Sequence, residues 1–373
     1  MIPVEPFFRA LEADNATFYA GVPDSLLKNF CAYLTDHSTS HIIAANEGNA
    51  VALAAGHYLA TGNPGVVYMQ NSGLGNAVNP LLSLADPEVY GIPMVLLIGW
   101  RGEPGVKDEP QHKKQGRVTA ALLDAMEVPY SVLDADTSHW KESVSRLVNL
   151  ARQRKGPVAL LVKANTFETY QLKSKTVSTY PMAREEAIRI IVEALPEWTY
   201  VSTTGFASRE LFEIREKAGQ GHGRDFLTVG SMGHSLQIAL GMALSRNEGK
   251  ICCLDGDGAV LMQMGGLAVA AQSGRDFLHV LLNNGCHDSV GGQPTVGHST
   301  DFLATGAAVG YPHRFSVSTA EDLGSVLKEV GSLRGPVLLE VRIKGGARAD
   351  LGRPTTTTHE NKEAFMASLG VKP

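Results

Sequence analysis

The sequence predicts an α/β protein made of two doubly wound parallel-sheet domains. Short apolar runs alternate along the chain with longer segments of helical period, which is typical of parallel sheets covered by helices on both faces. The length of 373 residues exceeds one ordinary domain of about 150–200 residues. Thr166–Pro181 is polar, lacks periodicity and ends in proline, as linkers do. We therefore expect a domain boundary near residue 175.

Six strands are predicted in each half of the chain, and helical segments separate most of them. In the first half they lie near Thr17–Val22, His41–Ala45, Gly65–Gln70, Pro93–Ile98, Tyr130–Leu133 and Pro157–Val162. In the second half they lie near Tyr200–Thr203, Phe226–Val229, Ile251–Leu254, Phe277–Leu282, Arg314–Val317 and Pro336–Val341. The last strand of each half follows a Gly-Pro break, which indicates either two related domains or two ordinary helix-to-strand turns.

Composition narrows the class of protein. Apolar residues make up 44% and charged residues 19%, and the net charge is −5, so neither disorder nor binding of nucleic acid is expected. No stretch reaches the ~20 apolar residues that span a bilayer, and the N-terminus does not resemble a signal peptide, so we expect no membrane partner and a cytoplasmic location. Because the four cysteines show no CxxC spacing, we expect free thiols rather than disulfides or a zinc site.

A glycine-rich turn in the second half carries the strongest chemical signal. The run Ile251–Leu254 is followed by Asp255-Gly256-Asp257-Gly258-Ala259, then by a helical segment through Gln272 and a strand that ends in Asn283-Asn284-Gly285. Such a turn exposes backbone N–H groups at a helix start, where a diphosphate can bind. Asp257 offers an anionic oxygen and Asn284 a neutral one, so both could bind a Mg²⁺ that also contacts the diphosphate, with the carbonyl of Cys286 as a third ligand.

The spacing makes this signal specific. Gly-Asp-Gly alone is expected by chance in about one chain in ten of this size, and adding Asn-Asn at a set distance lowers that about 400-fold. Here Asn284 follows Asp257 by 27 residues. The combination resembles the diphosphate-binding motif of the thiamine-diphosphate enzyme superfamily. The resemblance implies thiamine diphosphate and Mg²⁺ as cofactors, with Asp257, Asn284 and the Cys286 carbonyl as metal ligands and with Gly256, Gly258 and Ala259 beside the diphosphate.

Two further segments of the second half resemble cofactor-binding parts of the same superfamily. Gly230-Ser231-Met232-Gly233-His234 precedes the predicted helix Ser235–Leu244, and the resemblance implies that Met232 supports the bent cofactor while the Gly230 carbonyl accepts from its aminopyrimidine. A core methionine between glycines is the alternative. Thr204-Gly205-Phe206-Ala207-Ser208 resembles the loop that caps the diphosphate. Family members often carry a hydroxyl where Phe206 stands, so Thr204 and Ser208 are the candidate donors.

Glu47 is the candidate activating carboxylate. It stands between the predicted strand His41–Ala45 and a helix predicted over 49–60. A glutamate at a helix start is also an ordinary partner of the helix dipole. In the superfamily that Glu47 resembles, a glutamate at this junction hydrogen-bonds a pyrimidine nitrogen and promotes loss of the thiazolium proton. An apolar pocket would raise the pKa of such a carboxylate and suit it to share a proton.

Segments in both halves resemble the phosphonopyruvate decarboxylase family in sequence and in order. They are Gly21–Leu27, Asn46–Gly48, Gly99–Glu103, Asp108–His112, Gly291–Thr295 and Leu351–Thr357. The resemblance implies the thiamine-diphosphate-binding fold without a middle domain. It places a pyrimidine-binding domain in residues 1–170, a linker in 171–182 and a diphosphate-binding domain in 183–373.

The same resemblance indicates residues for an anionic 2-oxoacid substrate. Ser25 resembles a residue that contacts the substrate carboxylate, and His112 a histidine used for proton transfer; the alternatives are a helix N-cap and a surface histidine. The other candidates are Asp24, His287, Gln293 and Arg353. Four further cations are weaker candidates for the anionic head group, because cations on polar loops are mostly solvated: Lys107, Lys113, Lys114 and Arg348.

The resemblance implies Mg²⁺-dependent decarboxylation of 3-phosphonopyruvate in phosphonate biosynthesis. Sulfopyruvate decarboxylase is the nearest alternative, because the two substrates differ only in phosphonate against sulfonate. A non-catalytic thiamine-diphosphate-binding protein is a third interpretation, although Glu47 would then have no task. A dinucleotide-binding dehydrogenase is disfavoured, since no G-x-G-x-x-G follows the first strand of either half. The superfamily resemblance also implies a homodimer or larger homo-oligomer with active sites between subunits.

Overall fold

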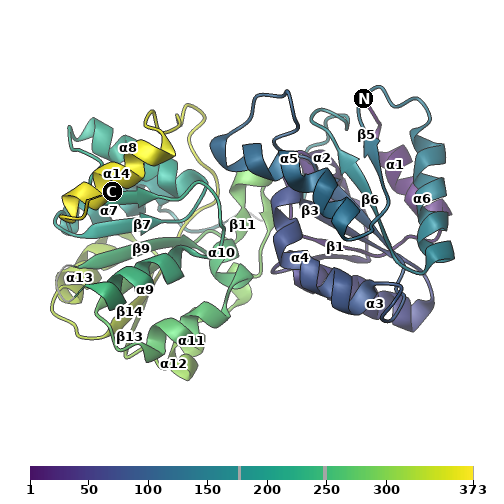
Figure 1. Ribbon diagram of the computed structural model, residues 1–373. Helices are drawn as coiled ribbons and strands as arrows, with labels where there is room; N and C mark the ends of the chain where they lie inside the picture. Colours follow the sequence, from purple (N-terminus) through teal and green to yellow (C-terminus); the bar gives the residue numbers. More distant parts are fainter. Residues whose placement is uncertain (175–177, 247–249, 373) are drawn as a thin grey trace. The chain divides into compact units, whose positions relative to one another are not determined.

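Two six-stranded parallel sheets organise the chain, one in each of two units, which we describe separately (Figure 1). The first unit comprises Met1–Lys175 with Val290–Gln293, and the second comprises Thr176–Ser289 with Pro294–Pro373. The computed structural model describes residues 1–174, 178–246 and 250–372. The boundary predicted near residue 175 lies outside the described residues.

The first unit has the strand order β2-β1-β3-β4-β6-β5, and every neighbouring pair is parallel. Its strands are β1 (Tyr19–Gly21), β2 (His41–Ile43), β3 (Gly65–Gln70), β4 (Met94–Gly99), β5 (Tyr130–Leu133) and β6 (Pro157–Val162). Its helices are α1 (Val4–Ala13), α2 (Lys28–His37), α3 (Glu47–Thr61), α4 (Leu74–Pro80), α5 (Pro110–Ala125) and α6 (Trp140–Arg154), with the short turns η1 (Asn71–Gly73) and η2 (Leu81–Ala85).

Helices cover both faces of this sheet, which explains why its central strands are apolar at successive positions. On one face α1, α2 and α6 bury side chains such as Phe7, Phe30 and Leu147 against alternate strand residues. On the other face α3, α4 and α5 do the same through small residues of α3 and through Leu74 and Leu123. The sheet is therefore packed on both faces, and the loops that follow its strands begin from this packed core.

The second unit repeats this architecture with the strand order β8-β7-β9-β10-β14-β13. Its strands are β7 (Thr199–Ser202), β8 (Asp225–Leu227), β9 (Ile251–Gly256), β10 (Phe277–Asn283), β13 (His313–Val317) and β14 (Pro336–Arg342). Its helices are α7 (Arg184–Ala194), α8 (Phe206–Lys217), α9 (Ser235–Ser245), α10 (Asp257–Met262), α11 (Gly265–Gln272), α12 (Phe302–Val309), α13 (Ala320–Val330) and α14 (Thr358–Ser368). The chain also forms a small pair of strands, β11 (Cys286–His287) and β12 (Gln293–Pro294), and the turns η3 (Asp288–Val290) and η4 (Gly297–Ser299).

The two units share one chain path, because the strands that correspond in sequence order stand in the same order across each sheet. The strands after the two Gly-Pro breaks, β6 and β14, occupy the same place. The similarity seen between these segments in the sequence therefore lies on equivalent strands. Helices α7, α8 and α13 cover one face of the second sheet, and α9, α11 and α12 cover the other.

The predicted fold class is confirmed, and each predicted strand overlaps an observed one. The helix predicted through Gln272 was wrong as one element: it is broken between Met262 and Gly265, where two consecutive glycines make the helix weak. Helix α3 begins at Glu47 rather than at 49, because Asn46 caps it. The strand pair β11–β12 was not predicted. All four cysteines are free, and no helix of the described ranges is long and apolar enough to cross a membrane.

Candidate cofactor and metal site

Two sequence-predicted residues of the first unit, Asp24 and Glu47, lie just after its parallel strands end, at the edge where ligands bind in open α/β sheets, and so does Arg101. Asp24 follows β1, Glu47 follows β2 and Arg101 follows β4. This shared edge brings together residues that are far apart in the sequence.

Glu47 is a buried carboxylate at the start of α3. The side chain of Asn46 accepts the N–H of Asn49 at 2.9 Å and so fixes where the helix begins. Glu47 is 5% exposed, and burial raises the pKa of its carboxyl. Asn76 on α4 donates to Glu47 Oε2 at 2.7 Å, a contact that the sequence did not indicate. The acid is therefore oriented by a neutral donor and easier to protonate than a solvated glutamate.

Gly73 leaves the space that the Glu47 side chain fills. A Cβ at Gly73 would lie 2.3 Å from Glu47 Oε1, and a Cβ at Gly48 would lie 2.8 Å from the carbonyl oxygen of Asn76. Real Cβ atoms are essentially never found within 3.0 Å of another heavy atom. The carboxylate position consequently depends on the absence of a side chain in the turn before α4.

Asp24 and Ser25 form a second polar cluster of the first unit. Asp24 is fully buried, and burial raises the pKa of its carboxyl. It accepts from Gln70 Nε2 at 2.7 Å and from the N–H of Leu26 at 2.8 Å. Asp24, rather than Ser25, therefore caps the turn that precedes α2, and the Ser25 hydroxyl itself donates to Asp24 Oδ1 at 3.5 Å.

Arg101 is a residue that the sequence analysis did not assign. Its Nη1 donates to Ser25 Oγ at 2.8 Å, while Nε and Nη2 donate to Asp108 at 2.8 and 2.5 Å. The guanidinium holds the pKa of the Asp108 carboxyl well below its usual range, although burial opposes this. His112 is buried rather than on a surface loop, and its carbonyl lies where a Cβ at Gly102 would be. Ser25 and His112 are thus both packed against the Arg101–Gly102 loop.

Candidate residues of the second unit also follow strand ends: Thr204 after β7, Met232 after β8, Asp257 after β9 and Asn284 after β10. Asp257 is 2% exposed, and burial raises its pKa to about 6. The hydroxyl of Thr295 donates to it. A Cβ at Gly297 would lie 2.3 Å from Asp257 Oδ2, so the carboxylate fills a cradle made by a glycine.

Asn284 provides the second oxygen. It lies one residue beyond β10, which pairs with β9 through Leu282 and Gly256. Its Nδ2 donates to Asp288 at 2.7 Å, and its Oδ1 accepts from the N–H of Cys286 at 3.2 Å. One buried carboxylate and one amide oxygen on neighbouring strands form the hard, oxygen-only donor set that Mg²⁺ prefers, so these residues fit the implied metal.

Gly258 lies between a predicted cofactor residue, Met232, and a predicted substrate residue, His287. A Cβ there would lie 3.3 Å from Met232 Cε and 3.0 Å from His287 Cε1. Ser231, before the methionine, has a φ of 54°, so the loop after β8 makes a sharp turn there. Burial lowers the pKa of His287 to about 4, so this imidazole is neutral at pH 7. The structure therefore brings Met232, Gly258 and His287 together.

The candidate hydroxyls after β7 differ in environment. Ser208 is buried, and its Oγ lies 2.6 Å from Ser202 Oγ and within hydrogen-bond distance of the carbonyl oxygens of Thr203, at 2.8 Å, and Thr228, at 3.0 Å. Its hydroxyl is thus used inside the unit. The hydroxyl of Thr203 is buried and makes no hydrogen bond, and Thr204 is partly exposed. This geometry favours Thr203 and Thr204 over Ser208 as donors to a ligand.

Gln293 lies on β12, which pairs with β11, the strand that contains His287. Arg353, Lys107, Lys113 and Lys114 are exposed.

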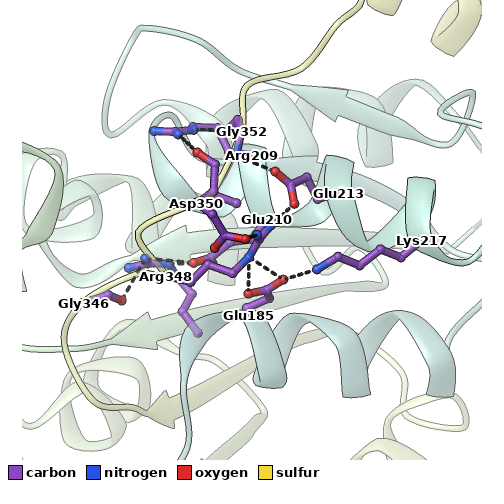
Figure 2. A network of polar contacts seen from close by, with 11 residues as sticks. Glu185, Arg209, Glu210, Glu213, Lys217, Gly346, Arg348, Asp350 and Gly352 are labelled. Carbon is purple, nitrogen blue, oxygen red and sulfur yellow. Dashed lines mark hydrogen bonds and ion pairs between the residues drawn. The ribbon is translucent and has the colours of Figure 1, made fainter.

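Arg348 is already paired with carboxylates. It pairs with Glu185 at 3.0 Å, with Asp350 at 3.0 Å and with Glu213 (Figure 2). Three carboxylates around one guanidinium leave little of its charge for an anionic substrate.

A further polar cluster lies beneath the Gly-Asp-Gly turn. Cys253, Asp255 and His279 are buried, with His279 Nε2 3.6 Å from Asp255 Oδ2. Asp255 Oδ1 accepts the N–H of Gly256 at 3.0 Å. This pair therefore supports the first residue of the turn from inside the sheet.

Two family models and several curated proteins match the chain. The thiamine pyrophosphate enzyme N-terminal TPP binding domain matches residues 4–126, and the corresponding C-terminal TPP binding domain matches residues 208–341. The chain is 34% identical to the phosphonopyruvate decarboxylase of Streptomyces viridochromogenes over 398 residues, which cover 100% of this chain and 96% of the relative.

Two more distant similarities complete the comparison. The sulfopyruvate decarboxylase of Methanosarcina acetivorans is 25% identical over 400 residues, covering 99% of this chain and 98% of the relative. Among solved structures, benzoylformate decarboxylase from Polynucleobacter necessarius has a TM-score of 0.40 and 15% identity, covering 93% of this chain and 100% of that chain.

Proposed function

Since the chain belongs to the phosphonopyruvate decarboxylase family of thiamine-diphosphate-dependent enzymes, we propose that it converts 3-phosphonopyruvate to phosphonoacetaldehyde and CO₂. That it is a decarboxylase of the phosphonopyruvate or sulfopyruvate type follows from the family itself. The phosphonate substrate is supported by sequence identity to relatives that match nearly the whole chain. The identity is 34% to a phosphonopyruvate decarboxylase and 25% to a sulfopyruvate decarboxylase. Phosphonate biosynthesis, a cytoplasmic location and Mg²⁺ dependence are parts of the same proposal.

Glu47 is the proposed activating acid. When bound, thiamine diphosphate supplies the electron sink that allows a 2-oxoacid to lose CO₂. Glu47 would hold a proton against a pyrimidine nitrogen, a task that suits a buried carboxylate with a raised pKa and a neutral partner in Asn76.

Asp257, Asn284 and the Cys286 carbonyl are the proposed Mg²⁺ ligands. Eight residues are proposed to line the cofactor: Thr203, Thr204, Gly230, Ser231, Met232, Gly256, Gly258 and Ala259. Ser208 is not among them, because its hydroxyl is hydrogen-bonded inside the second unit.

Ser25 and His112 are the proposed substrate residues of the first unit. Ser25, held by Arg101, would donate to the substrate carboxylate, and His112 would supply a proton to the product. Asp24 fixes the turn that presents Ser25. His287, neutral at pH 7, would contact substrate without adding charge. Each complete site is proposed to form between two copies of the chain, so that the assembly is a homodimer or a larger homo-oligomer.

Steady-state kinetics with both acids test the substrate. We expect kcat/KM for 3-phosphonopyruvate to exceed that for 3-sulfopyruvate at least about tenfold, which corresponds to about 1.4 kcal/mol of preference in the transition state. Formation of phosphonoacetaldehyde would be followed by phosphorus NMR. A preference for 3-sulfopyruvate would refute the proposed substrate. Turnover of neither acid by protein that retains the cofactor would favour a binding protein instead.

A further inference from the structure

The carboxylate of Asp288 accepts several hydrogen bonds beside the proposed metal site. It lies four residues after Asn284, whose Nδ2 donates to Asp288 Oδ2 at 2.7 Å. The same carboxylate accepts from Arg184 Nη1 at 2.9 Å and from the N–H of Gly346 at 2.9 Å, and the thiol of Cys286 donates to it at 3.1 Å. Three separate segments of the second unit therefore meet at one side chain.

Arg184 is the buried cation of this cluster. It is 7% exposed at the first position of α7. Its Nε and Nη2 donate to the two carboxylate oxygens of Glu210 on α8, at 2.8 and 3.1 Å, and Nη1 reaches Asp288. A buried guanidinium is tolerated when its charge is paired and its donors are used, and here both conditions are met. Arg184 thereby fixes Asp288 to the helices that cover the sheet.

The contact between Asp288 and Asn284 bears on which end of the Asn284 side-chain amide, oxygen or nitrogen, faces the proposed metal site. Asn284 has an oxygen that can bind a hard cation and a nitrogen that cannot. Because Asp288, a pure acceptor, holds the nitrogen, the oxygen is directed away from it. If Asp288 were absent, only the 3.2 Å hydrogen bond that Oδ1 accepts from the N–H of Cys286 would oppose rotation of the amide, which could then present its NH₂ group to the metal.

We propose that Asp288, held by Arg184, is a positioning residue that orients Asn284 Oδ1 toward Mg²⁺. This inference rests on the proposed function in so far as Asn284 is taken to be a metal ligand. Groups that orient metal ligands in this way change metal affinity by about 10- to 100-fold when they are removed. Figure 2 shows neighbouring contacts that fasten the segment after β14 to α7 and α8: Arg348 pairs with Glu185, and the N–H of Gly352 donates to Glu213.

The test measures the Mg²⁺ concentration that half-saturates binding of thiamine diphosphate, followed by equilibrium dialysis without substrate. Asp288→Ala and Arg184→Met should each raise this concentration by about 10- to 100-fold. Asp288→Asn keeps an acceptor oxygen and should recover part of the loss. Arg215→Met is the matched control, because Arg215 makes an equally buried bidentate pair with Asp225 in the same unit. It should lower the melting temperature but leave the Mg²⁺ dependence unchanged.

A second background separates positioning from general damage. In Asn284→Ala protein, which lacks the amide, Asp288→Ala should cause no further change in the Mg²⁺ dependence. An equal further loss there, or a shift caused by Arg215→Met as large as that caused by Arg184→Met, would overturn the proposal. If Asn284→Ala alone left the Mg²⁺ dependence unchanged, the metal assignment itself would be wrong. If Asn284→Ala weakened Mg²⁺ binding while Asp288→Ala did not, only the positioning role would fall.

Discussion

Replacing Gly73 with alanine should displace the carboxylate of Glu47 while leaving its chemistry intact. The new Cβ would lie 2.3 Å from Oε1, 2.5 Å from Cδ and 2.6 Å from Cγ of Glu47. Ordinary contacts begin near 3.4 Å, so the carboxylate must move by about 1 Å. That movement also disturbs the 2.7 Å contact with Asn76.

The expected magnitude follows from this displacement. A misplacement of about 1 Å at a reacting group can cost about 100-fold in rate, and overpacking of a filled interior typically costs about 1–3 kcal/mol of stability. We therefore expect Gly73→Ala to fold with a lowered melting temperature and to exchange the C2 proton of bound thiamine diphosphate about 100-fold more slowly than wild type. Its dependence on Mg²⁺ should not change, because the proposed metal ligands lie in the other unit.

Acid-quenched deuterium exchange of the bound cofactor, read by NMR, measures this step without any substrate. Gly75→Ala is the control, since Gly75 lies two residues further on, at the start of α4, and its Cβ would meet nothing within 4 Å. In Glu47→Ala protein, Gly73→Ala should add almost no further destabilisation, because the atoms it collides with are gone. Wild-type exchange in Gly73→Ala, or equal slowing in Gly75→Ala, would refute the argument.

Three further outcomes are expected. Glu47→Gln should bind thiamine diphosphate but lose C2 exchange and turnover by several orders of magnitude, because an amide cannot share the proton; near-normal exchange would remove Glu47 from the mechanism. In the folded state the pKa of the Glu47 carboxyl is raised above its ordinary 4.5. The folded protein therefore binds the carboxyl proton more tightly than the unfolded chain does. Wild-type stability should consequently fall as the pH rises from 4.5 through the raised pKa. Glu47→Gln cannot titrate, so its melting temperature minus that of wild type should increase over this window, and a constant difference would contradict the assignment. Asp257→Ala should lose cofactor on gel filtration in Mg²⁺ buffer, and stoichiometric retention after EDTA treatment would count against the metal site.

Strand positions could be read from the sequence because both sheets are covered on two faces. Runs such as Val66–Met69 and Ile251–Leu254 are buried at every position, so their apolar character alone marks them. The break between α10 and α11 was less visible, since Gly265 and Gly266 stand in an otherwise apolar stretch of helical period. The pair β11–β12 is too short to leave a periodic pattern.

Site residues that stand in recognisable motifs could be predicted from the sequence, whereas their hydrogen-bond partners could not. Glu47 and Asp257 stand at strand ends in recognisable motifs, and both are buried as that interpretation requires. Asn76 and Arg101 were not assigned, because nothing in the sequence around Asn76 or Arg101 indicates a contact across 29 or 76 positions. Ser208 illustrates the opposite case: its place in a loop motif suggested a ligand contact, whereas its hydroxyl is used by the surrounding backbone.

The shared strand order of the two units has a consequence for how such a protein can change over evolutionary time. Equivalent loops contain different candidate residues: the loop after β2 leads to Glu47, whereas the equivalent loop after β8 contains Met232. Each unit also encloses its own apolar cores. If Ser25 contacts the substrate as proposed, mutations around Ser25 and Arg101 would allow a new acid to be selected while the loops that follow β9 and β10 are inherited unchanged.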